Sequence, residues 1–91
     1  MVYKFIITLQ LQPGARDEVL ARAPEVRAER GCIAYDFFTC SDDPNRLVFV
    51  ESWRSKEAHE WHLEQNHTKA FIAFHEPKHL SFRFETINAE P

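Results

Sequence analysis

The sequence is poor in the features on which several protein classes depend. It has two glycines in 91 residues, and neither belongs to a phosphate-binding loop or a dinucleotide-binding motif. No motif for an activated nucleophile can be read either, which disfavours transferases and nicotinamide enzymes. Basic residues are not in excess, because the net charge is −3, so no basic patch indicates a nucleic-acid partner.

Long apolar runs are also absent. None approaches the roughly 20 residues that a membrane-spanning helix needs. The N-terminal stretch lacks the basic flank and small-residue cleavage site of a secretion signal. We therefore expect a cytoplasmic protein with no membrane partner.

Cysteine is scarce, and its spacing argues against an internal disulfide. Cys32 and Cys40 lie eight residues apart in what reads as one strand. At about 3.3 Å per residue their Cα atoms would be roughly 26 Å apart. A disulfide needs less than about 7 Å, so we expect two reduced thiols.

The hydrophobic pattern that remains predicts a single domain, residues 1–91, with one modest core. The predicted elements lie at residues 3–11 (strand), 15–30 (helix), 32–39 (strand), 47–53 (strand), 55–65 (helix), 69–74 (helix) and 80–87 (strand). This order predicts a ferredoxin-like βαββαβ fold of the α+β class. Its four-stranded antiparallel sheet would carry the helices on one face.

Local signals mark where these elements begin and end. Pro24 lies inside the first helical pattern and predicts a kink or break near residues 20–23. Gly31 is expected to close that helix in a left-handed conformation. Turn-forming residues at 41–45 predict a hairpin, and Ser55 is expected to cap the second helix.

Strand 47–53 is apolar on both sides, with Leu47 and Phe49 on one face and Val48 and Val50 on the other. Helices can cover only one face of the sheet. A second copy of the chain is the simplest cover for the other face, so we expect a homodimer.

The richest stretch for chemistry runs over residues 47–74. Two indoles and two imidazoles, Trp53, Trp61, His62 and His67, lie within fifteen residues. Such groups suit a flat aromatic ligand and a side chain that titrates near neutral pH. The structural alternative is that the tryptophans only anchor the helix to the sheet and His62 fills the edge of the core.

Glu51 shares its strand face with Phe49 and Trp53. Burial there would raise the pKa of Glu51 and make it a possible acid or base. The alternative is an ion pair with an arginine, with Arg83 on the last strand as the candidate. The five histidines do not form the His-Glu-x-x-His zinc pattern, so we expect no metal.

Several short motifs together resemble one family. They are Glu29-Arg30-Gly31-Cys32 leading to Tyr35, the loop Asp43-Pro44-Asn45-Arg46, Glu51-Ser52-Trp53, His62-Leu63, and His67 followed by Lys69-Ala70-Phe71. Their order and spacing are similar to those of the antibiotic biosynthesis monooxygenase family, which includes small quinol monooxygenases.

The resemblance implies a homodimeric α+β barrel with a pocket between sheet and helices in each subunit. It also implies oxygenation of phenols or quinols without flavin, haem or metal. Some relatives degrade haem, with an Asn on the first strand, and others isomerise small phosphorylated sugars. Residues 3–11 contain no Asn, which counts against haem.

These observations lead to one functional hypothesis. The chain is expected to be a cofactor-independent monooxygenase that oxidises a small aromatic or quinol, polyketide-like substrate with dioxygen. His62 and Glu51 are the expected catalytic residues, and the expected substrate contacts are Trp53, Trp61, His67 and Phe71. The alternatives are a non-catalytic dimer that binds a small hydrophobic ligand, and an isomerase or cyclase using the same pocket.

Overall fold

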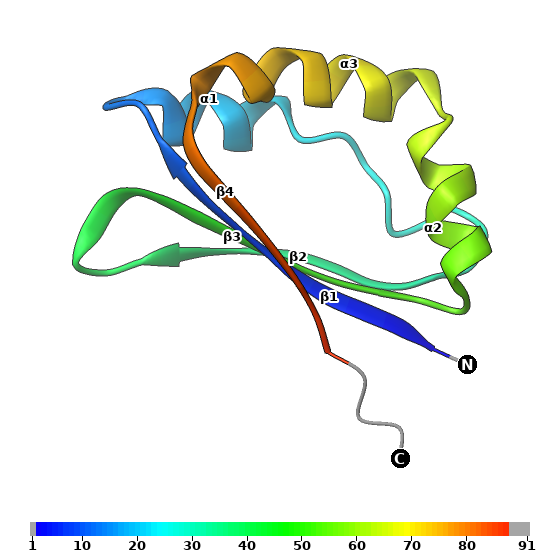
Figure 1. The fold of residues 1–91 in the computed structure, drawn as a ribbon. Helices are drawn as coiled ribbons and strands as arrows, with labels where there is room; N and C mark the ends of the chain where they lie inside the picture. Colours follow the sequence, from blue (N-terminus) through cyan, green and yellow to red (C-terminus); the bar gives the residue numbers. More distant parts are fainter. Residues whose placement is uncertain (1, 88–91) are drawn as a thin grey trace.

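The computed structural model describes residues 2–87 of the chain. Its elements, in order, are β1 (Tyr3–Leu11), α1 (Ala15–Arg22), β2 (Cys32–Cys40), β3 (Asp43–Trp53), α2 (Lys56–Leu63), α3 (Asn66–His75), the short 3-10 helix η1 (Glu76–Lys78) and β4 (His79–Thr86). The strands form one antiparallel sheet in the order β2-β3-β1-β4. The helices lie over one face of it (Figure 1). The predicted ferredoxin-like fold is confirmed.

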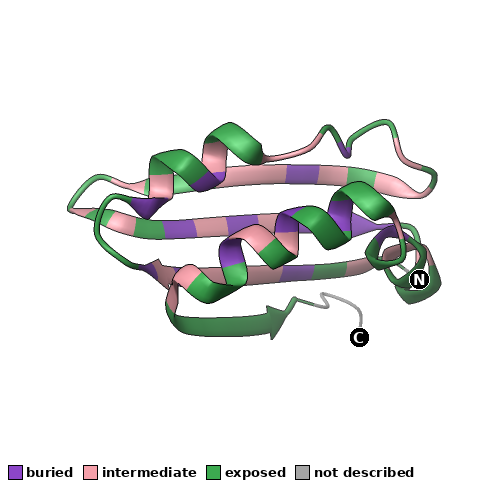
Figure 2. Ribbon diagram, turned by 90° about the horizontal axis from the view of Figure 1, so that it is seen from above, coloured by how far each residue is buried: buried purple, intermediate pink, exposed green. Residues whose placement is uncertain are grey.

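The core lies between the helices and the inner face of the two central strands. On β1, Phe5 and Leu9 have no exposed surface, and Leu47 and Trp53 of β3 are equally buried. Alternate residues of a strand point to opposite faces, so these side chains line the helix-covered side. Figure 2 shows buried positions recurring along both strands beneath the helices. None of the helices among residues 2–87 is long and apolar enough to span a membrane.

The first helix is shorter than predicted. It ends at Arg22 rather than at residue 30, which confirms the expected break and corrects the rest of the prediction. Ala23 has extended dihedrals (φ −62°, ψ 124°), the conformation favoured for a residue that precedes proline. Residues 24–31 therefore cross the helix-covered side as an irregular loop, which returns to the sheet at Cys32.

The other boundaries differ by a few residues. The β2–β3 hairpin turns at Ser41 and Asp42 alone, because β3 already begins at Asp43. The break between α2 and α3 falls at residues 64–65, so α3 begins three residues earlier than predicted. Ser55 caps α2 as expected, its hydroxyl accepting the Ala58 N–H at 3.1 Å. Both cysteines are free.

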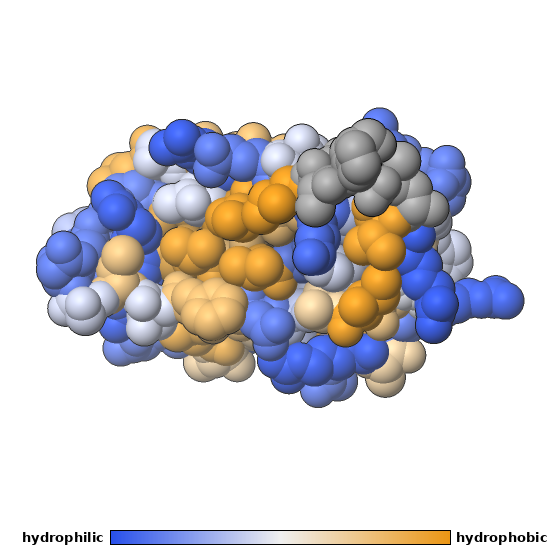
Figure 3. Space-filling view, turned by 90° about the horizontal axis from the view of Figure 1, so that it is seen from below, coloured by the Kyte–Doolittle hydropathy of each residue, from blue (hydrophilic) through white to orange (hydrophobic). Residues whose placement is uncertain are grey.

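The outer face of the sheet carries an apolar patch that no helix of residues 2–87 covers. Ile6, Phe38, Val48 and Val50 point to this side, as their pairing registers require. Phe38 is 54% exposed. Figure 3 shows apolar side chains gathered in the middle of this face.

The end of the 24–31 loop packs directly against α2. Gly31 has φ +83°, and a Cβ placed on it would lie 2.6 Å from the Cβ of Ala58. Gly14 has the same φ, but no atom within 4 Å of the position that its Cβ would occupy. The two glycines share the same conformational requirement and differ only in the space around them.

We predict that Gly31→Ala destabilises the fold more than Gly14→Ala does. Both variants place a side chain in the left-handed region, at a cost of about 1–2 kcal/mol. Gly31→Ala adds overpacking against α2, typically about 1–3 kcal/mol. Denaturant unfolding of the two variants measures this difference. Equal free energies of unfolding would contradict the close contact.

Candidate functional site

A cavity of about 550 Å³ lies between the inner face of the sheet and helices α2 and α3. It is lined by Ile7, Tyr35, Phe49, Glu51, His59, His62, Leu63, Thr68, Phe71, Ile72, His75, Glu76, His79, Phe82 and Phe84. Most of the wall's surface is apolar, although eight of the fifteen side chains carry a polar or titratable group. Ligand sites of small molecules commonly have this size and composition.

His62, from α2, is 3% exposed and lines the cavity. Its Nδ1 lies 2.7 Å from Oε1 of Glu29 and 3.3 Å from Oγ1 of Thr68. When the Glu29 carboxylate is ionised it can only accept, and Nδ1 must then carry the proton that His62 donates to it. The neutral imidazole then keeps its lone pair on Nε2. The ring packs against Trp53, with 4.7 Å between centroids.

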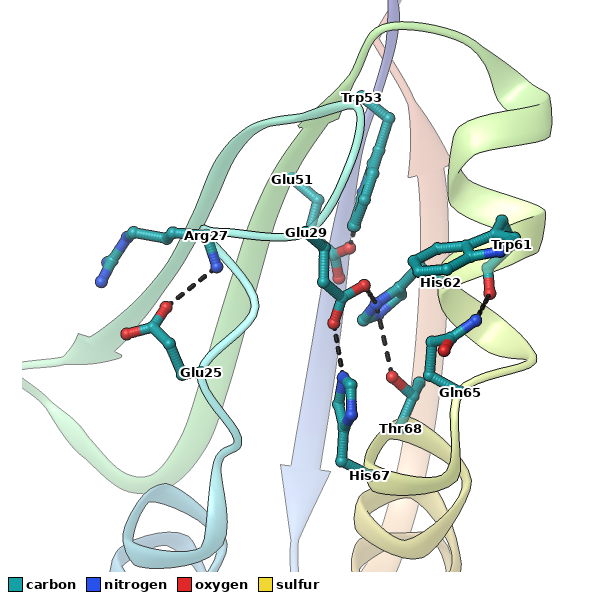
Figure 4. Close-up of polar contacts among 10 residues, drawn as sticks. All are labelled: Glu25, Arg27, Glu29, Glu51, Trp53, Trp61, His62, Gln65, His67 and Thr68. Atoms are coloured by element: carbon teal, nitrogen blue, oxygen red, sulfur yellow. Dashed lines mark hydrogen bonds and ion pairs between the residues drawn. The ribbon is translucent and has the colours of Figure 1, made fainter.

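Glu29 comes from the irregular loop and contacts two histidines. Its second oxygen, Oε2, lies 2.5 Å from Nε2 of His67. Figure 4 shows the carboxylate between the two imidazoles, one from α2 and one from α3. His67 is about half exposed and is not among the residues that line the cavity, whereas Glu29 is largely buried.

Glu51 is buried on β3 and also lines the cavity. Its Oε1 accepts a hydrogen bond from Nε1–H of Trp53 at 3.0 Å. Burial raises its pKa to about 7, the Trp53 bond works in the opposite direction, and the charge of Glu29 adds to the rise. The alternative pair with Arg83 is wrong, since Arg83 bonds to Glu85 at 3.1 Å.

The two tryptophans lie outside the wall. Trp53 is fully buried behind Glu51 and His62 and is not among the lining residues. Trp61, another predicted substrate contact, is 49% exposed and is not among the lining residues. Consecutive helical residues point about 100° apart, which places Trp61 away from the cavity while His62 faces it.

His59 is a cavity residue that the sequence reasoning missed. It precedes His62 by three positions, a spacing that puts both on one helix face and could have revealed it. Its ring lies 4.7 Å from that of Phe5. Burial lowers its pKa to about 4, with a further contribution from the charge of His62.

A second polar group lies where α3 ends and β4 begins. His75 Nδ1 and His79 Nε2 are 2.9 Å apart, and both residues line the cavity. Burial lowers the pKa of His75 to about 4, with help from His79, and lowers that of His79 as well. Phe71, predicted as a substrate contact, lines the wall one turn before His75, with ring centroids 4.7 Å apart.

Candidate metal ligands were sought among the histidine, cysteine and acidic side chains. Over residues 2–87, no three of them are arranged to hold a metal ion. Acids and bases of the chain face the cavity. Neutral imidazoles and one carboxyl that titrates near pH 7 face an apolar space.

Comparison with known proteins identifies similar chains. Residues 2–73 match the family model described as antibiotic biosynthesis monooxygenase. A crystal structure described by the same words is 27% identical, with a TM-score of 0.86 and 100% of both chains covered. An uncharacterized protein of Synechocystis sp. is 26% identical over 68 residues, which are 70% of this chain. The matched residues make up 46% of that relative, so the chain spans about half of its length.

Two further solved structures share the fold at lower identity. One, from Pseudomonas aeruginosa, is 24% identical with a TM-score of 0.84 and covers 99% of this chain and 95% of its own. Another, from Mycobacterium tuberculosis, is 23% identical with a TM-score of 0.85, at 100% and 97% coverage. At these identities the likeness concerns the fold alone.

The raised pKa of Glu51 predicts how stability changes with pH. Between its ordinary value of 4.5 and about 7, folded Glu51 holds a proton that the unfolded chain has lost. The free energy of unfolding therefore falls as pH rises through this window. Glu51→Gln cannot ionise but can still accept from Trp53, so its stability relative to the parent should grow by up to about 3 kcal/mol toward pH 8.

Denaturant unfolding of both proteins from pH 4.5 to 8 measures this difference. His59 and His75 oppose the trend, because their lowered pKa values make the fold lose stability as pH falls below 6.5. Both histidines are present in parent and variant, so their effect cancels. If the difference in the free energy of unfolding between parent and Glu51→Gln does not vary with pH, Glu51 does not titrate in this window.

Proposed function

Because the chain belongs to the antibiotic biosynthesis monooxygenase family, we propose that it oxidises a small aromatic or quinol substrate with dioxygen, without flavin, haem or metal. The observation that carries this proposal is the position of His62. A buried imidazole, fixed through Nδ1 by Glu29, lies in the wall of an apolar cavity. That arrangement suits removal of a phenolic proton in a water-poor space.

The cavity volume of about 550 Å³ lies within the usual range for small-molecule sites and suits a substrate of two or three fused rings. Phe49 and Phe71, whose rings are nearly parallel at 17°, supply flat apolar surface beside it. Trp53 acts from behind the wall by bonding Glu51 and packing on His62. Trp61 and His67 are too exposed to form the walls of the cavity.

The first step of the proposed reaction is proton transfer from the substrate hydroxyl to Nε2 of His62. The resulting phenolate is electron-rich and passes one electron to dioxygen, and recombination forms the new carbon–oxygen bond. One oxygen atom stays on the ring, and the other leaves as water. The quinol supplies all four electrons, so the product is a hydroxylated quinone.

Glu51 is proposed as the second acid–base group. With a pKa of about 7, it can take up or release a proton at neutral pH. The hydrophobic wall and the bond from Trp53 hold it beside the space that the substrate would fill. Its role is to return a proton to the departing oxygen as water forms.

Oxygen consumption with a panel of dihydroquinones and polycyclic phenols tests the proposal. His62→Ala should lower the rate by about 10²–10⁴-fold, the usual contribution of a positioned acid–base group. Glu60→Ala, on the solvent side of the same helix, is the matched control and should leave the rate unchanged. His59 cannot serve as the control, because it lines the cavity.

Two results would count against an oxygenase. Equal oxygen uptake by the parent and His62→Ala would remove His62 from the mechanism. Binding of these compounds by the parent without oxygen uptake would favour the ligand-binding alternative. Conversion of a ligand without oxygen uptake would favour an isomerase or cyclase.

We also propose that two copies pair through the outer face of the sheet. The apolar patch of Ile6, Phe38, Val48 and Val50 is the surface that a partner would cover. Phe38→Asp should convert the dimer to a monomer in sedimentation, because pairing would bury the new charge. Trp61→Asp, also at a half-exposed aromatic but on the helical layer, should stay dimeric. A Phe38→Asp protein that sediments like the parent would contradict this interface.

A further inference from the structure

One carboxylate serves two imidazoles beside the cavity. Oε1 of Glu29 lies 2.7 Å from Nδ1 of His62, and Oε2 lies 2.5 Å from Nε2 of His67. The first imidazole is buried in the cavity wall, while the second is 45% exposed to solvent. Glu29 thus connects the candidate base to a solvent-exposed imidazole (Figure 4).

The chemistry of the two contacts differs. At His62 the carboxylate accepts from Nδ1–H, which leaves Nε2 free to take a proton and stabilises the imidazolium that results. At His67 the same carboxylate accepts from an imidazole that solvent can protonate. A protonated His67 repels a second cation at His62 and so offsets the attraction of Glu29. The two imidazoles therefore compete for Glu29.

We propose that Glu29 is the positioning residue for His62, and that His67 modulates it by competing for the same carboxylate. When His67 is protonated, Glu29 is already compensated, and His62 accepts a substrate proton less readily. When His67 is neutral, the full charge of Glu29 favours imidazolium formation at His62. The effect of this competition on turnover rests on the proposed function, but the contacts of Glu29 with the two imidazoles can be measured whether or not the protein is an oxygenase.

Other ionisable groups surround this trio. Burial is the main cause of the raised pKa values of Tyr35 and Cys32 on β2 and of Glu51 on β3, and the charge of Glu29 adds a smaller contribution to each. His59, on α2, lies 5.9 Å from His62 between ring centroids. In the part of the chain that the structure describes, the Glu29 carboxylate hydrogen-bonds only His62 and His67. The surrounding groups are the same in every variant compared below.

The test is nuclear magnetic resonance of the full chain with ¹⁵N-labelled histidine. Long-range ¹H–¹⁵N spectra report, for each imidazole, which nitrogen carries the proton and whether the ring is charged. In the parent, neutral His62 should carry its proton on Nδ1, because a carboxylate cannot donate. A proton on Nε2 instead would overturn the positioning role.

Three variants separate the two contacts. Glu29→Gln removes the charge, so His62 should become an imidazolium only at a pH lower by about one unit or more. His67→Ala removes the competitor, so His62 should be charged at a higher pH than in the parent. Lys69→Ala is the matched control, since it removes an exposed cation from the same helix without touching Glu29.

The outcomes are decisive in both directions. The competition is refuted if His67→Ala and Lys69→Ala equally shift the pH at which His62 becomes charged. It is also refuted if His67→Ala leaves that pH as in the parent. The positioning role fails if Glu29→Gln does not alter the protonation of His62. If Glu29→Gln does not fold, the surface variant His67→Ala still decides the competition. Absence of oxygen uptake would remove the proposed function but would leave these spectra interpretable.

Discussion

The contact between Glu29 and His62 is the interaction on which the candidate site depends. Both side chains are largely removed from water, and burial of either one alone would be unfavourable. The contact also fixes the irregular loop that follows Pro24 against α2. Val26 is fully buried on one side of Glu29, and Gly31 touches Ala58 on the other, so the loop has little freedom to place the carboxylate elsewhere.

Much of the fold was readable from the sequence, because its signals are local. The alternation of apolar and polar residues predicted β1, and Ser55 predicted the start of α2. The order of the elements along the chain predicted the ferredoxin-like topology. The path of residues 24–31 was not readable. Helical periodicity continues past Pro24 in the sequence, but the proline removes a backbone donor and favours an extended conformation at Ala23.

The site was predicted in part for the same reason. His62, Glu51 and Phe71 line the cavity, because strand alternation and helical spacing determine where they point, while their catalytic and binding roles stay predictions. Trp61 lies outside the wall although it is adjacent to His62 in sequence, because consecutive helical residues point about 100° apart. Glu29 was seen only as part of a motif, since its pairing with His62 and His67 joins a loop to two helices, and no spacing rule covers such a contact.

The cavity combines groups with different protonation behaviour. Burial lowers the pKa values of His59 and His75 and keeps these imidazoles neutral, whereas it raises that of Glu51 to about 7. Environments that separate the pKa values of neighbouring groups are typical of sites that move protons. The central claim is that a phenolic oxygen binds at His62 in this space. A crystal structure with a bound hydroxynaphthoquinone tests this claim most directly. The account predicts a ligand oxygen within about 3.2 Å of Nε2 of His62. A ligand bound only outside the cavity, or with its oxygens directed solely at His75 and His79, would contradict it.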